Sequence, residues 1–105
     1  MVSITVDEEI IKTKAYELSQ EPKSHDDLVW LFAEAELRLK PAYLIGKLYD
    51  ESKVVNIDAD LLVDQPSEDE IRVYADELAK QNPADQDLHW YIAERNYVFE
   101  QAKLG

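Results

Sequence analysis

Cysteine is absent from this 105-residue chain, and glycine occurs only twice. Without cysteine the chain has no disulfide framework, no thiol nucleophile and no cysteine-based metal site. Two glycines are too few for a phosphate-cradling loop, and no serine lies in a glycine-flanked nucleophile elbow. These absences exclude several kinds of catalytic site, so we expect neither enzyme activity nor a cofactor.

Basic residues are also scarce, because 11 lysines and arginines accompany 23 aspartates and glutamates, for a formal net charge of −12. Nucleic acids and anionic lipid surfaces attract positive charge, so we expect direct contact with neither. An acidic surface favours association with basic protein surfaces instead. No apolar run approaches membrane-spanning length, and the first residues lack the features of a signal peptide. We therefore expect a cytoplasmic protein.

The chain does contain an internal repeat. The segment DLVWLFAE at 27–34 returns as DLHWYIAE at 87–94, an offset of 60 residues. Identical residues at this offset include eight pairs: Ile11 and Ile71, Ala15 and Ala75, Glu17 and Glu77, Leu18 and Leu78, Leu28 and Leu88, Trp30 and Trp90, Ala33 and Ala93, Glu34 and Glu94. A repeated unit covers its apolar face with a neighbouring unit. We expect a single domain over 1–105, with repeat one at 7–39, a connector at 40–66 and repeat two at 67–103.

Each repeat carries the signals of two helices joined by a turn that contains proline. Capping-box spacings, in which a hydroxyl residue precedes an acidic residue by three positions, begin at Thr5, Ser24 and Ser67. Pro22 and Pro83 separate the paired helices, the last of which is expected over 86–103. We predict a mainly α-helical fold of two tandem helical hairpins, related by a pseudo-twofold repeat and sharing one core.

The connector has weaker signals. Pro41 and the apolar residues 44, 45 and 48 predict a short helix over 42–50, despite Gly46 in its interior. Apolar and polar residues alternate over 54–61 and again over 2–6, which predicts a two-stranded β element within one chain or across a homodimer. The alternative for the later residues is a helical turn over 59–63 capped by Asp58.

The repeated residues resemble the bacterial domain of unknown function family 2934. In repeat one the resemblance is carried by Ala15, Tyr16, Glu17, Leu18, Pro22, His25, Asp27, Leu28, Trp30, Leu31, Ala33 and Glu34. Repeat two keeps Ala75, Glu77, Leu78, Pro83, Asp87, Leu88, Trp90, Ala93 and Glu94, but has Asp76 where repeat one has Tyr16, and Asp85 where it has His25. The resemblance implies helical hairpins and a bacterial cytoplasm, and it implies no function.

Six symmetrically placed residues are candidates for an interaction surface or a ligand slot: Trp30, Glu34, Trp90, Glu94, Glu17 and Glu77. The two indoles could stack across the pseudo-twofold axis, although tryptophan at a helix-packing position is usually part of the core. The four carboxylates could form a metal or acid–base site, or they could cap turns and pair with nearby basic residues.

Metal-binding motifs are missing from the chain. A carboxylate-bridged metal bundle needs glutamate three residues before histidine, but His25 follows Pro22 and His89 follows Gln86 at that spacing. The aspartates over 58–64 lack the glycine of a helix-loop-helix calcium site. We therefore expect no metal ligands.

The combined pattern favours a small, non-catalytic adaptor or regulatory module that binds another protein with a basic surface. One alternative is a DNA mimic that occupies a nucleic-acid-binding protein with carboxylates spaced like phosphates. A further alternative is a metal- or ligand-binding helical domain. Each of these is compatible with a homodimer, because the apolar faces of the second and last helices are wide.

Overall fold

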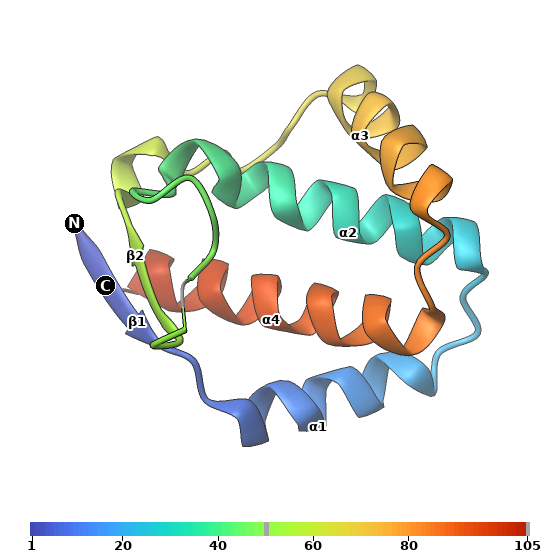
Figure 1. The fold of residues 1–105 in the computed structure, drawn as a ribbon, viewed down its shortest axis with the longest axis horizontal. Coiled ribbons are helices and arrows are strands. Elements are labelled where there is room, and N and C mark those ends of the chain that lie inside the picture. Colours follow the sequence, from blue (N-terminus) through green and yellow to red (C-terminus); the bar gives the residue numbers. More distant parts are fainter. Residues whose placement is uncertain (50, 105) are drawn as a thin grey trace.

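The computed structural model describes residues 1–49 and 51–104. In the described ranges, four α-helices and a two-stranded antiparallel sheet form the fold (Figure 1). The elements are β1 (Val2–Thr5), α1 (Glu8–Ser19), α2 (His25–Leu39), β2 (Val54–Ile57), α3 (Glu68–Gln81) and α4 (Asp85–Leu104), with 3₁₀ turns at Lys40–Ala42 and Ala59–Leu61. The prediction of a mainly α-helical fold with a short β element is confirmed.

Local capping chemistry sets where the helices begin. Ser24 and Asp27 form the expected capping box of α2, and the Ser67 side chain accepts a hydrogen bond from the Glu70 amide at the start of α3. The predicted cap of α1 at Thr5 is wrong. Thr5 belongs to β1, and the Asp7 carboxylate accepts from the first-turn amides in its place, at 3.1 and 3.3 Å.

The two-stranded element forms within one chain. β1 and β2 run antiparallel, with Val2 opposite Ile57 and Thr5 opposite Val54. The alternative predicted for the following residues is present in part, since Asp58 caps the 3₁₀ turn Ala59–Leu61 directly after the strand ends. The strand and the helical turn are therefore both present, in successive segments rather than as alternatives for the same residues.

The helix predicted over 42–50 is wrong. Tyr43 forms a β-bridge with Ile57, the Leu44 amide donates to the Asn56 carbonyl at 3.3 Å, and residues 44–48 form bends. Pairing with β2 occupies backbone groups that a helix would need, and Gly46 has a left-handed φ of +74°. Residue 50, the predicted end of this helix, lies outside the described residues.

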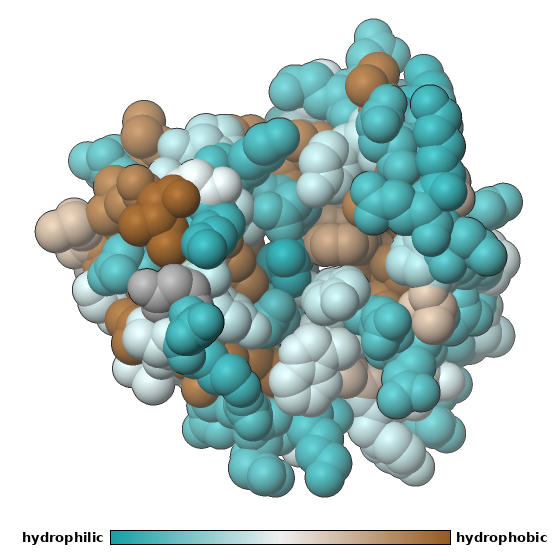
Figure 2. Space-filling model, viewed as in Figure 1, coloured by the Kyte–Doolittle hydropathy of each residue, from teal (hydrophilic) through white to brown (hydrophobic). Residues whose placement is uncertain are grey.

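The bend leaves apolar side chains at the surface. Leu44 and Ile45 are each 47% exposed and Leu61 is 51% exposed, whereas Leu48 is buried. Figure 2 shows apolar side chains gathered on the left of the molecule, where Figure 1 places the chain between α2 and β2. The apolar pattern over 44–48 therefore reflects only one core position.

Each repeat pairs its helices with those of the other repeat. α1 packs on α4, α3 packs on α2, and α2 packs on α4. Figure 1 shows α4 between α1 and α2, although α1 and α2 are consecutive in the chain. This exchange explains why the apolar faces of α2 and α4 are wide, because each helix covers two neighbours within one chain.

The buried apolar side chains form two clusters, and both repeats contribute to each. The first lies between the sheet, α1 and the second half of α4, with Ile11, Leu39, Val55 and Val98 almost fully buried. The second joins α2, α3 and the first half of α4 around Leu28, Ile71, Leu78, Leu88 and Ile92. None of the described helices is long and apolar enough to cross a membrane.

Candidate functional site

The two repeated tryptophans do not share a slot. Trp30 is partly buried against the second apolar cluster, and Trp90 is partly buried against the first. They occupy equivalent positions, but the exchange of helices directs each ring to a different part of the core. Trp90 alone also lines a surface groove, which is described below.

The four repeated glutamates are also dispersed. Glu17 and Glu77 are exposed on α1 and α3, and Glu77 lies 3.8 Å from the Lys80 ammonium. Glu34 pairs with Arg38 one turn later, at 3.3 Å. Only Glu94 is buried, with 3% of its surface exposed. The structure thus places these carboxylates at separate positions rather than in one acid–base or metal site.

Glu94 belongs to a buried polar cluster centred on Arg95, which the sequence reasoning missed. The Arg95 Nε donates to Glu36 Oε2, and its Nη1 donates to Glu94 Oε1 at 2.9 Å. The hydroxyl of Tyr43 donates to Glu36 Oε1 at 2.7 Å, and that of Tyr49 donates to Glu94 Oε2 at 2.6 Å. The two carboxylates therefore each receive a guanidinium and a phenol donor.

Aromatic rings enclose the guanidinium of Arg95. Its Cζ lies 4.8 Å from the ring centroid of Phe32 and 5.4 Å from that of Tyr91. The two rings are themselves in contact, with centroids 5.3 Å apart. A cation beside ring faces and carboxylates interacts with both, which holds α2 against α4 at this point.

Burial and the two carboxylates shift the proton affinities in this cluster. Burial, with the charge of Glu36, raises the pKa of Tyr43 far above its usual value, and burial with the hydrogen bond to Glu94 raises the pKa of Tyr49 to about 12. Burial alone would lower the pKa of Arg95, but Glu36 and its neighbours outweigh this and raise it. The tyrosines stay protonated as donors at neutral pH, so the cluster fastens the segment after α2 to the core.

The two histidines lie apart. His25, the first residue of α2, places its Nδ1 2.6 Å from the Asp85 carboxylate at the start of α4, a residue exactly one repeat offset away. His89 faces the groove between α1 and α4. Among the described residues, no group of three or more histidine, aspartate or glutamate side chains could hold a metal ion.

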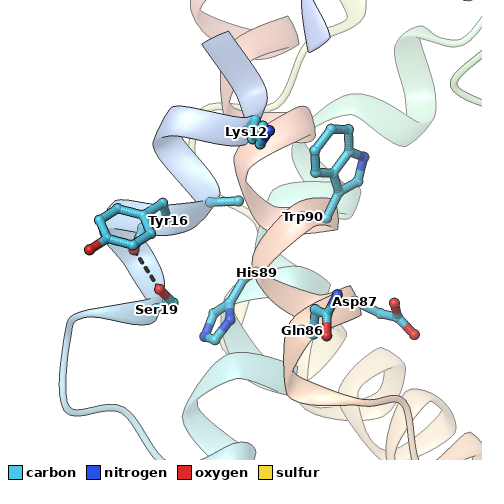
Figure 3. A pocket seen from close by; sticks show the side chains of 8 residues that line it. Lys12, Tyr16, Ser19, Gln86, Asp87, His89 and Trp90 are labelled. Atoms are coloured by element: carbon cyan, nitrogen blue, oxygen red, sulfur yellow. Dashed lines mark hydrogen bonds between the residues drawn. The ribbon is translucent and has the colours of Figure 1, made fainter. Parts of the chain in front are cut away.

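A groove of about 400 Å³ separates α1 from the first turns of α4. It is lined by Lys12, Ala15, Tyr16, Ser19, Gln86, Asp87, His89 and Trp90. Figure 3 shows Ser19 on α1 near His89 on α4, with Lys12 and Trp90 toward the upper end and the Tyr16 ring directed away from α4. The Ser19 hydroxyl donates to the Tyr16 carbonyl at 2.6 Å, so it is engaged with the backbone.

No protein-family model, curated protein or solved structure matches the chain. The resemblance to domain of unknown function family 2934 therefore stays a prediction, and the function is argued from the geometry alone.

The missed cluster did have a signal in the sequence. Glu36 lies four residues after Phe32 and three before Leu39, and all three are buried on one face of α2. Arg95 similarly lies between Ile92 and Val98 on α4. Charged residues within an apolar stripe are seldom buried unless they are paired. Glu36 and Arg95 carry opposite charges in two such stripes, which is the signal that they could pair.

Proposed function

We propose that this protein is a small acidic adaptor or regulatory module that binds another protein through a basic surface of that partner, without catalysis. The observation that carries the proposal is where the charge lies. Of the carboxylates in the described residues, only Glu36 and Glu94 are buried, and Arg95 lies between them. The excess of acidic over basic side chains is therefore presented to solvent, where it attracts basic surfaces and speeds association.

The acidic surface is less suited to imitating DNA. A mimic needs a continuous row of carboxylates, but Arg72 and Lys80 interrupt the row on α3 and pair with their acidic neighbours. Other aspartates lie in the first turns of α2 and α4, where they stabilise the positive end of the helix dipole. These positions support a mixed surface for protein binding.

The test is capture of partners from a lysate of the native host by the tagged protein, at about 50 mM and about 500 mM salt, because screening shortens from about 14 Å to about 4 Å between them. We expect a basic protein that is enriched at low salt and lost at high salt. A partner retained equally at both salts, or the absence of any basic partner, would contradict the proposal.

Two variants control for charge. Glu17→Gln/Glu77→Gln removes two exposed carboxylates at equivalent positions of the repeats and should reduce capture. Lys12→Gln removes an exposed positive charge and should increase it. Equal capture by both variants would show that the surface charge does not drive binding.

A further inference from the structure

A second groove, of about 410 Å³, lies between α2 and α3. It is lined by the apolar or aromatic side chains of Leu37, Val73 and Tyr74 and by the acidic residues Asp69, Glu70 and Glu77. Val73 is 65% exposed, although most other exposed side chains of α3 are charged. The hollow is shallow and open, and an exposed apolar side chain in it marks a candidate surface for a partner protein.

Repeat one has a more polar lining at the equivalent face. The equivalent hollow beside α1 is lined by Glu9, Ile10, Thr13, Lys14 and Glu17. At the offset of 60 residues, Thr13 corresponds to Val73 and Lys14 to Tyr74. Thr13 and Lys14 of repeat one are thus replaced by valine and tyrosine in repeat two, whereas Ile10 is replaced by Glu70 and Glu17 keeps its type as Glu77.

The charged side chains that line the α2–α3 groove are all acidic, namely Asp69, Glu70 and Glu77, and basic side chains lie outside the lining. Asp69 pairs with Arg72 at 3.3 Å and Glu77 pairs with Lys80 at 3.8 Å, and all four side chains are more than half exposed. Exposed pairs of this kind are weak and can exchange for a partner's cations. Lys40 lies over the Tyr74 ring, 5.5 Å from its centroid, and is a basic group that an incoming cation must avoid.

We propose that the α2–α3 groove binds a basic amphipathic helix of the partner protein. This inference rests on the proposed function and assigns it a surface. Apolar side chains of the helix, one turn apart, enter between Leu37 and Val73, and its lysines or arginines lie toward Asp69, Glu70 and Glu77. The groove supplies the apolar contact and the carboxylates select the charge.

The experiment measures binding of a synthetic fluorescent peptide in which leucine and lysine alternate at helical spacing. Its control has the same composition in scrambled order. Val73→Asp is compared with Thr13→Asp, which makes the same residue at the equivalent exposed position of repeat one. Both variants make the protein more acidic, and circular dichroism verifies that each is folded.

We expect Val73→Asp to weaken peptide binding about tenfold, because it removes the apolar contact. Thr13→Asp should leave binding unchanged or strengthen it, since it adds only negative charge. Amide NMR shifts on peptide addition should centre on Leu37, Val73 and Tyr74.

Three results would overturn the inference: equal affinity of the two variants, equal affinity for the scrambled peptide, or no binding at low salt. The first two results do not contradict the proposed function, because the protein would still bind the basic peptide through charge alone. The lysate experiment decides that function separately.

Discussion

Replacing Arg95 with methionine removes a buried cation and leaves the carboxylates of Glu36 and Glu94 in place. The side chain of Arg95 is only 14% exposed, and those of Glu36 and Glu94 are 10% and 4% exposed. Breaking a buried ion pair by removing one partner costs about 3–5 kcal/mol, because the remaining charge is uncompensated. Domains of this length have a free energy of unfolding of about 5–15 kcal/mol. Arg95→Met should therefore lose a large part of the stability.

The measurement is urea denaturation at neutral pH followed by tryptophan fluorescence. Trp30 and Trp90 are partly buried against different clusters, so the signal reports on both parts of the core. The matched control is Arg72→Met. That side chain is 57% exposed and pairs with the exposed carboxylates of Glu68 and Asp69 on α3, so its loss should cost no more than about 1 kcal/mol.

A triple variant separates charge from packing. Glu36→Gln/Glu94→Gln/Arg95→Met has no buried charge in the cluster, and its amide oxygens can still accept from Tyr43 and Tyr49. It should recover at least half of the stability that Arg95→Met loses. If Arg95→Met costs less than about 1 kcal/mol, or if the triple variant is no more stable, the cluster does not hold the helices together as argued.

Two further perturbations test the segment after α2. The pKa of Tyr49 rises from 10.0 in the unfolded chain to about 12 in the fold, so the contribution of this residue to stability is fully present below pH 10 and is lost as the pH rises toward 12. Phenolate absorbance and denaturation between these pH values should show this loss, and Tyr49→Phe should reduce it; an unchanged slope would contradict the assignment. Gly46→Ala should cost about 1 kcal/mol through its positive φ alone, because a Cβ there meets nothing within 4 Å. Thermal melting measures this cost, with Ala42→Gly, which instead removes a fully buried methyl group, as the comparison. If Gly46→Ala leaves the melting temperature unchanged, the left-handed backbone is not required at this position.

The helix boundaries could be predicted because their causes are local. Ser24 and Ser67 each lie three residues before an acidic side chain, and both cap the expected helix. Helix capping needs no information from elsewhere in the chain. Thr5 has the same spacing but belongs to β1, so pairing with β2 decides its conformation and Asp7 becomes the cap.

Features that depend on distant partners could not be predicted in the same way. The apolar pattern after Pro41 suited a helix, but the bridge between Tyr43 and Ile57 overrides it. The repeat showed which helix faces are apolar, but periodicity does not state which helix covers each face. The candidate site was affected most, since Glu94 was selected for its symmetry and is buried beside Arg95, which has no counterpart in repeat one.

The exchange of helices between the repeats gives the connector a role as a tether. α1 and α3 each pack on a helix of the other repeat, so two separate copies of one repeat could make the same set of contacts only as a dimer. Joining the halves in one chain converts that association into an intramolecular step at high effective concentration. Contacts between the two repeats therefore form without a second chain, and this part of folding does not depend on protein concentration. If the chain were cut within residues 40–66, association of the two halves would again depend on protein concentration.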